Sequence, residues 1–183
     1  MAETKLFTFS VLVDNSPGVL SQISRLFART GFNIESITAG KTVEGGGTRL
    51  TIDVLADERK KDLLTNQIMK MVPVHSVKVL DQSHSIRREL SLFKVRAETP
   101  ERRSEVLQIV NIFRGSIIDV SKETVTVSVI GDGKKIQAVQ ELLADFGLIE
   151  VARSGVIALE RGKYTIDENT KEKGEFNYGK NVL

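Results

Sequence analysis

The apolar residues of this chain follow the same succession of periods twice, and that repeat limits the fold more than any other feature. In each half, a segment of alternating apolar residues precedes a segment with helical spacing, two more alternating segments, a second helical segment and a last alternating one. The order is βαββαβ. We therefore predict an α+β protein of two ferredoxin-like βαββαβ domains in tandem, each with two helices on one side of an antiparallel sheet.

The expected elements follow from this pattern. In the first half we predict strands at about 5–13, 33–41, 48–56 and 74–80, helices at about 17–30 and 57–71, and a flexible hairpin at Gly45–Gly47. In the second half we predict strands at about 89–97, 116–120, 124–130, 148–152 and 156–159, with helices between Thr99 and Gly115 and between Gly131 and Gly147. The domains then cover residues 1–80 and 89–162, joined by a polar linker at 81–88 and followed by a polar tail at 163–183 that we expect to be disordered.

The segment from Asp14 to Leu20 joins the first strand to the first helix. Pro17 fits the first helical position, where its missing N–H has no cost. Gly18 leaves the backbone bare at the start of the helix, where unpaired amides can bind a small anion such as a carboxylate. Gly31 fits the position that ends the helix, and we expect Asn33 to begin the next strand. The segment is typical of a ligand-sensing loop rather than a catalytic one.

Composition excludes several classes of function. The chain has no cysteine, so it has no disulfide, thiolate metal site or cysteine nucleophile. It has 26 Lys and Arg against 24 Asp and Glu, evenly spread, so no segment resembles a nucleic-acid-binding arm. No apolar run approaches the roughly 20 residues that span a bilayer, and the start lacks the apolar core of a signal peptide. We expect a soluble, cytoplasmic protein that binds neither nucleic acid nor membranes.

The residues that might carry catalysis are few. His75 and His84 lie near no nucleophile motif and have no metal-ligand spacing, so we expect surface or structural roles for both. Residues 131–133, Gly-Asp-Gly, do not satisfy the phosphate-loop pattern, and a tight turn with Asp132 as a helix cap is the better interpretation. The central strands carry none of the aromatics of an RNA-recognition module. We therefore predict no catalytic residue and no metal site.

Three segments give the chain a family resemblance. Residues 9–37 read FSVLVDNSPGVLSQISRLFARTGFNIESI, residues 112–120 read IFRGSIIDV and residues 150–162 read EVARSGVIALERG. The first resembles the ACT domain of the small, regulatory subunit of acetolactate synthase (acetohydroxyacid synthase), and the other two resemble signatures of that subunit. The resemblance covers about residues 5–162, and nothing carries over to the tail.

The resemblance implies a function. A small subunit of this family is not catalytic and holds no cofactor; it binds a large catalytic subunit that uses thiamine diphosphate, Mg²⁺ and FAD. It raises the activity of that subunit and confers feedback inhibition by valine or a related branched-chain amino acid. ACT domains pair as homodimers with the effector at the interface. A domain of about 80 residues is also marginal alone, and one sheet face in each half has no helix to cover it, which favours pairing.

The resemblance also places the effector site. It implies a loop and helix start from one protomer, with a strand start from its neighbour. The corresponding residues here are Asn15, Ser16, Pro17, Gly18, Val19, Leu20, Asn33 and Ile34. Amides near Gly18 suit the effector carboxylate. The Asn33 side chain suits both carboxylate and ammonium. Leu20 fits an aliphatic pocket and the core equally well.

Two other functions are kept as alternatives. One is a stand-alone ACT-type amino-acid sensor acting on a different partner, although the chain has no helix-turn-helix or basic segment for direct contact with DNA. The other is a small enzyme on the same scaffold, such as an acyl-phosphate hydrolase, which lacks a catalytic constellation. Recovery of a large flavoprotein with the chain separates the regulatory subunit from the sensor.

Overall fold

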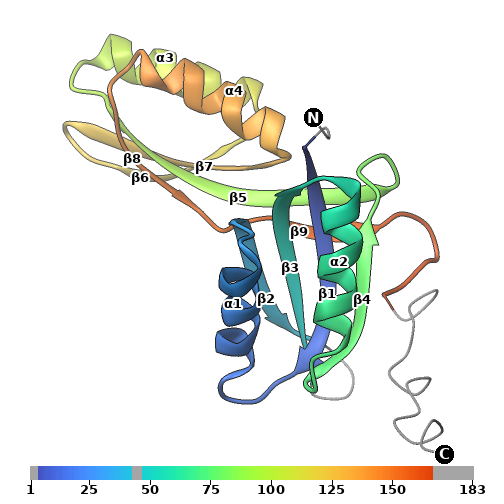
Figure 1. The fold of residues 1–183 in the computed structure, drawn as a ribbon. Helices are drawn as coiled ribbons and strands as arrows, with labels where there is room; N and C mark the ends of the chain where they lie inside the picture. The colour runs from blue at the N-terminus through green and yellow to red at the C-terminus, as the bar shows by residue number, and fades with distance from the viewer. Residues whose placement is uncertain (1–3, 43–46, 167–183) are drawn as a thin grey trace, which may run out of the picture. The chain divides into compact units, whose positions relative to one another are not determined.

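The computed structural model describes residues 4–42 and 47–166 of the 183-residue chain, and its contacts divide the chain into two units. The second unit comprises residues 87–157, and the first comprises the residues up to 86 together with those from 158 onward. Both are drawn in Figure 1. Residues 158–162, which the sequence pattern assigns to the second domain, therefore belong with the first unit.

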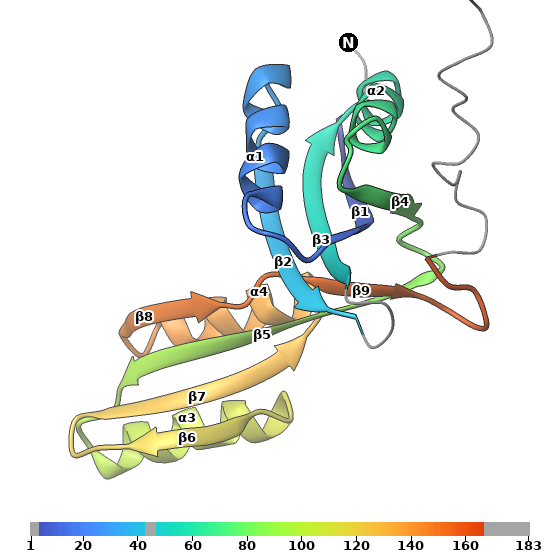
Figure 2. The ribbon, with the colours of Figure 1, turned by 90° about the horizontal axis from the view of Figure 1, so that it is seen from below.

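The first unit has the predicted βαββαβ order. Its elements are β1 (Lys5–Asp14), α1 (Val19–Thr30), β2 (Ile34–Lys41), β3 (Gly47–Ala56), α2 (Glu58–Met69) and β4 (Val74–Leu80). The antiparallel sheet has the strand order β2-β3-β1-β4. Figure 2 shows α1 and α2 on the same side of this sheet. The predicted hairpin at Gly45–Gly47 lies outside the described residues except for Gly47.

Alternation along β1 builds the core of the first unit. Phe9, Val11 and Val13 are at most 1 % exposed because they point toward the helices, where Ile23 and Phe27 are equally buried. Burying such large apolar side chains is the main favourable term in folding, at about 1.5–3 kcal/mol each. The period of two in the strand and the helical spacing in α1 therefore specify this side of the sheet.

The opposite face of the same sheet is polar and, contrary to expectation, is not left open. Thr8, Ser10 and Asp53 point to this face and are at most 3 % exposed, and the Thr8 hydroxyl donates to the Asp53 carboxylate at 2.6 Å. In Figure 2, β9 (Ile157–Glu160) crosses this side. The Arg49 guanidinium donates to the Ala158 carbonyl at 3.3 Å, and Lys78 pairs with the Glu160 carboxylate.

The residues after β9 continue this packing. The Lys78 ammonium donates to the Thr165 carbonyl at 3.2 Å, and Ile166 is only 8 % exposed. The packed chain thus extends past residue 162, where the sequence pattern places the end of the second domain. Residues 167–183, the rest of the predicted tail, lie outside the described residues.

The second unit repeats the order of elements. They are β5 (Ser85–Arg96), α3 (Pro100–Ile112), β6 (Ser116–Val120), β7 (Thr124–Gly131), α4 (Gly133–Ala144) and β8 (Leu148–Arg153). The strand order is β6-β7-β5-β8, and β9 also pairs with β5. Phe93 and Val95 are fully buried beneath α3 and α4 with Val127, Val139 and Leu143. Two ferredoxin-like βαββαβ domains in tandem were predicted, and the fold confirms this.

The predicted linker at 81–88 is shorter than expected, because β5 begins at Ser85. The preceding residues form a turn in which the Asp81 carboxylate accepts from the Ser83 amide at 2.7 Å and from the Ser83 hydroxyl. These hydrogen bonds hold the pKa of the Asp81 carboxyl below its usual range. A local Asx turn therefore replaces an extended linker.

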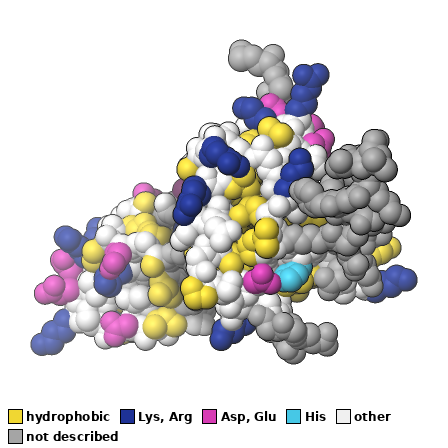
Figure 3. Space-filling model, turned by 60° about the horizontal axis from the view of Figure 1, so that its bottom comes forward, with side chains coloured by type: hydrophobic (Ala, Val, Ile, Leu, Met, Phe, Trp, Pro, Cys, Tyr) yellow, Lys and Arg dark blue, Asp and Glu magenta, His cyan; other side chains and the backbone are white. Residues whose placement is uncertain are grey.

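The helix-free sheet face of the second unit differs from that of the first. Leu90, Leu92 and Ile130 are 39, 37 and 59 % exposed there, while their strand neighbours Ser91 and Val129 are buried on the other face. On the side that Figure 3 displays, Lys and Arg lie interspersed with Asp and Glu, and apolar side chains gather between them.

No helix among the described residues is both long and apolar enough to cross a membrane.

Candidate functional site

The loop between β1 and α1 is tied to the neighbouring strand β4. The Asp14 amide donates to the Pro73 carbonyl at 2.8 Å, and the Asp14 carboxylate lies 2.6 Å from His75 Nε2. Both contacts follow from the sheet order, since β1 and β4 are antiparallel neighbours. Sequence reasoning missed His75 at this loop, and only the expected strand order would have indicated it.

The helix starts later than the sequence predicts. Gly18 is the N-cap with φ 87°, in the left-handed region, so α1 begins at Val19 and Pro17 precedes it. The left-handed backbone favours glycine at this position. Steric crowding does not require it, because a Cβ at Gly18 would meet nothing within 4 Å. The first intrahelical bond runs from the Gln22 amide to the Gly18 carbonyl at 3.0 Å. The start of α1 therefore opens directly to the surface.

Of the four described helices, α1 alone has no side-chain cap. The side chains of Asp57, Thr99 and Asp132 accept from the third amide of α2, α3 and α4, at 2.8, 3.3 and 2.9 Å. No side chain does so in α1. First-turn amides that no side chain caps, together with the helix dipole, attract an anion. The Asp132 cap was predicted from the sequence and is confirmed.

The predicted loop residues divide into exposed and buried ones. Asn15, Ser16, Pro17 and Gly18 are all exposed, whereas Val19 is 5 % exposed and belongs to the core. The next residue, Leu20, is 49 % exposed. Core packing in one chain therefore explains Val19 but not the exposed Leu20.

The two other predicted site residues lie at the far end of α1. Strand β2 begins at Ile34 rather than Asn33, and the exposed Asn33 side chain donates to the Glu35 carboxylate at 2.9 Å. Ile34 is half-buried against the core. Because α1 has 12 residues, it spans about 18 Å. Within one chain, Asn33 and the loop at 15–18 are therefore too far apart to hold one amino acid.

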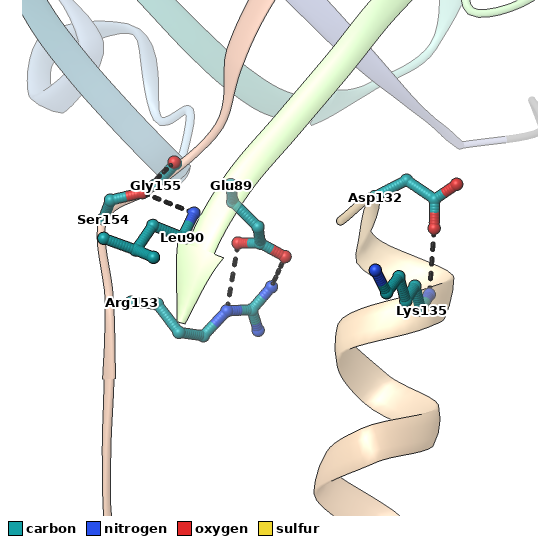
Figure 4. A network of polar contacts seen from close by, with 7 residues as sticks. All are labelled: Glu89, Leu90, Asp132, Lys135, Arg153, Ser154 and Gly155. Atoms are coloured by element: carbon teal, nitrogen blue, oxygen red, sulfur yellow. Dashed lines mark hydrogen bonds and ion pairs between the residues drawn. The ribbon is translucent and has the colours of Figure 1, made fainter. Parts of the chain in front are cut away.

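A second group of polar contacts lies in the second unit, in one of the segments that carry the resemblance. Figure 4 shows the Arg153 guanidinium against Glu89, whose side chain is 2 % exposed, with Nε 3.1 Å from the carboxylate. Ser154 forms two hydrogen bonds with Leu90. The Ser154 hydroxyl accepts from the Leu90 amide at 3.1 Å, and the Ser154 amide donates to the Leu90 carbonyl at 2.9 Å. These residues hold β8 to β5, so this segment has a structural role.

Two family models match the chain, one in each half. Residues 9–76 match a family model described as the AHAS small subunit-like ACT domain, and residues 88–162 match one described as the small subunit of acetolactate synthase. The chain is 45 % identical over 157 residues to a probable acetolactate synthase small subunit of Methanothermobacter thermautotrophicus, covering 86 % of this chain and 94 % of that one.

Two further relatives extend the likeness. An acetolactate synthase small subunit of Mycobacterium bovis is 42 % identical over 158 residues, again covering 86 % of this chain and 94 % of that one. The crystal structure of the acetolactate synthase small subunit of Thermotoga maritima superimposes with a TM-score of 0.81 at 38 % identity, covering 87 % of this chain and 99 % of that one. The likeness thus includes both units.

Proposed function

Since the chain belongs to the family of acetolactate synthase small subunits, we propose that it is the cytoplasmic regulatory subunit that stimulates a catalytic large subunit and makes it sensitive to valine. In this proposal the large subunit holds thiamine diphosphate, Mg²⁺ and FAD, and this chain holds none of them. The chain contributes control: it binds the branched-chain amino acid and transmits the binding to its partner.

The observation that carries the proposal is the uncapped start of α1. Valine has a carboxylate, an ammonium group and a branched aliphatic side chain. The first-turn amides after Gly18 suit the carboxylate, because no side chain among the described residues caps them. The exposed Leu20 offers an aliphatic surface beside them. The loop at Asn15–Gly18 thus supplies half of a valine site.

The other half comes from a second copy in a homodimer. β2 is an edge strand, and it runs parallel to β1 because both are antiparallel to β3. Antiparallel pairing of two β2 edges places the start of one β2 beside the end of the other, which is the end of the sheet where the loop lies. Asn33 and Ile34 of the second copy then lie close to the loop. Pairing supports the site because the length of α1 separates these residues in one chain.

Regulation requires that valine bind two states with different affinity. A ligand shared by two protomers stabilises the arrangement that brings both halves of the site together. Valine can then shift the equilibrium between the active and inhibited states of the large subunit only by the difference in its binding free energy to those states. That difference is typically about 1–3 kcal/mol, or a factor of about 5–150 in affinity.

Two substitutions at one position test the site. Gly18→Asp places a carboxylate where the effector carboxylate would bind, and Gly18→Asn is its uncharged control, which tolerates the left-handed backbone equally well. With the matching large subunit, Gly18→Asp should stimulate the synthase normally but abolish valine inhibition, while Gly18→Asn should retain most of the inhibition.

Each alternative predicts a different result. Normal valine inhibition of the Gly18→Asp complex would refute the site. If the unsubstituted chain neither stimulates nor co-purifies with a large flavoprotein, the regulatory role itself fails and the sensor for another partner is favoured.

A further inference from the structure

A groove between α1 and α2 lies on the helical side of the first unit, outside the proposed effector site. Its volume is about 330 Å³. Pockets that hold small molecules begin at about this volume. The residues that matter for its chemistry are Arg25, Leu26 and Arg29 from α1, and Gln67, Lys70 and Met71 from the end of α2 and the residues after it.

Three positive charges line this groove. Arg25 and Arg29 lie one turn apart on α1, and Lys70 lines the groove from the position directly after α2. None of the three forms an ion pair within residues 4–42 and 47–166, and no acidic side chain is among the lining residues. Like charges four residues apart on a helix repel each other, so a bound anion would stabilise this arrangement. Paired arginines suit the geometry of phosphate in particular, because each guanidinium can donate two parallel hydrogen bonds.

Gln67, which lines the groove, carries an acceptor without a donor. Gln67 Oε1 is buried and has no hydrogen-bond partner among the described residues. A buried polar atom in this state costs free energy until a donor reaches it. Leu26, which is 6 % exposed, and Met71 add apolar surface nearby. The complementary ligand therefore carries an anionic group, a hydrogen-bond donor and some apolar surface.

We propose that this groove is a second binding site, for a small phosphate-bearing metabolite that carries a hydroxyl or amino group. The phosphate lies between Arg25, Arg29 and Lys70, and the Gln67 side chain turns toward the groove so that its amide oxygen accepts from the hydroxyl or amino group. The groove between α1 and α2 does not depend on the proposed effector site, because the two sites share no residue. The test of the groove measures binding to this chain alone.

A second hollow on the same unit shows why charge alone does not make such a site. It is lined by Phe7, Lys61 and Asp81 among others. Its Lys61 ammonium already donates to the Glu58 carboxylate, pairs with the Asp62 carboxylate and lies 5.5 Å from the centroid of the Phe7 ring. Those contacts satisfy Lys61, whereas the cations between α1 and α2 have no such partners.

Titration calorimetry on the full chain tests the proposal. The probes are inorganic phosphate, inorganic pyrophosphate, ribose 5-phosphate and adenosine monophosphate. A phosphate ester should bind more tightly than inorganic phosphate, and more weakly as salt rises. The double variant Arg25→Gln/Arg29→Gln should weaken binding at least tenfold, since each hydrogen bond between charged groups accounts for about that factor. Arg59→Gln, an exposed arginine of α2 outside the groove, should leave it unchanged.

Gln67→Met separates the two parts of the proposal. It removes the acceptor and keeps a side chain of similar length, so affinity for the ester should fall while affinity for inorganic phosphate stays the same. The proposal is overturned if no probe binds at physiological ionic strength, or if the double arginine variant binds as the unsubstituted chain does. It is also overturned if no probe binds and that variant instead loses the large subunit, because the groove is then a surface for an acidic protein segment.

Discussion

The two units share one order of elements and one strand order, yet their first helices begin in different ways. In the second unit, Thr99 caps α3 and Pro100 occupies its first position. In the first unit, Gly18 stands at the cap position and provides no side chain, and Pro17 lies before the helix. A cap satisfies first-turn amides from within the chain, whereas a glycine leaves them for a ligand. The same fold is thus closed at one helix start and open at the other.

The sheet faces differ in the opposite sense. The first unit has a polar face that Ala158 and Glu160 contact through Arg49 and Lys78. The second unit exposes Leu90 and other apolar side chains on the equivalent face. The unit with the open helix start therefore has the covered sheet, so a repeated fold has been adapted at two separate places.

The largest effects are expected in the two cores, where the units correspond most closely. Phe9 and Phe93 occupy the first strand of each unit and are both fully buried. Replacing either by alanine should cost about 3–5 kcal/mol, through lost burial and the cavity left behind. Amide hydrogen exchange should rise in residues 5–80 for Phe9→Ala and in residues 89–153 for Phe93→Ala.

That experiment also asks whether the units unfold separately. The conservative variants Phe9→Leu and Phe93→Leu serve as controls and should show smaller changes at the same amides. If either alanine variant raises exchange equally in both halves, the chain unfolds as one cooperative body and the division into two units has no energetic meaning.

Local signals in the sequence predicted the elements, and contacts between distant residues explain what was missed. The alternation of Phe9, Val11 and Val13 predicted β1, and Gly31 predicted the end of α1, where it has the expected left-handed backbone with φ 73°. The packing of 158–166 onto the first unit had no such signal. It depends on Lys78 meeting Glu160, which no pattern of nearby residues encodes.

The candidate site shows the same limit. The exposed loop and the bare glycine were readable because turn chemistry is local. The helix start was placed at Pro17 because proline favours that position, but the left-handed Gly18 overrides it. The neighbour His75 comes from another strand and was not identified. The exposure of Leu20 also required the three-dimensional structure, since core and pocket residues have the same chemistry.

The next effect concerns the covered sheet face. Lys78→Met removes both the pair with Glu160 and the bond to the Thr165 carbonyl. Hydrogen bonds to charged groups contribute about 1.5–3 kcal/mol, so residues 158–166 should exchange faster and become cleavable by protease. Lys94→Met, which removes an exposed pair in the second unit, is the control. Equal protection of 158–166 in both variants would show that Lys78 does not hold this segment.

A smaller effect is expected at the capped helix. Thr99→Ala removes the acceptor for the Arg102 amide and should lower the free energy of unfolding by about 1 kcal/mol. Thr99→Ser keeps a hydroxyl there and should be close to the unsubstituted protein. Valine inhibition should not change in either variant, and denaturant unfolding and synthase assays check the two statements. A loss of inhibition in Thr99→Ala would break the contrast between the two helix starts.

The smallest effect is expected for an exposed ion pair of the second unit. In the second unit, the Lys94 ammonium donates to the Glu150 carboxylate at 2.8 Å, and this bond holds the pKa of the Glu150 carboxyl below its usual value. A carboxyl with a lowered pKa in the folded state adds stability above its unfolded pKa, and that stability is lost as the pH falls through the folded pKa. A carboxyl titration by NMR should place the pKa of Glu150 below that of an ordinary glutamate and return it toward the ordinary value in Lys94→Met. Because both side chains are exposed, salt should weaken the shift, and a shift that persists at high salt would show that this face is covered rather than open.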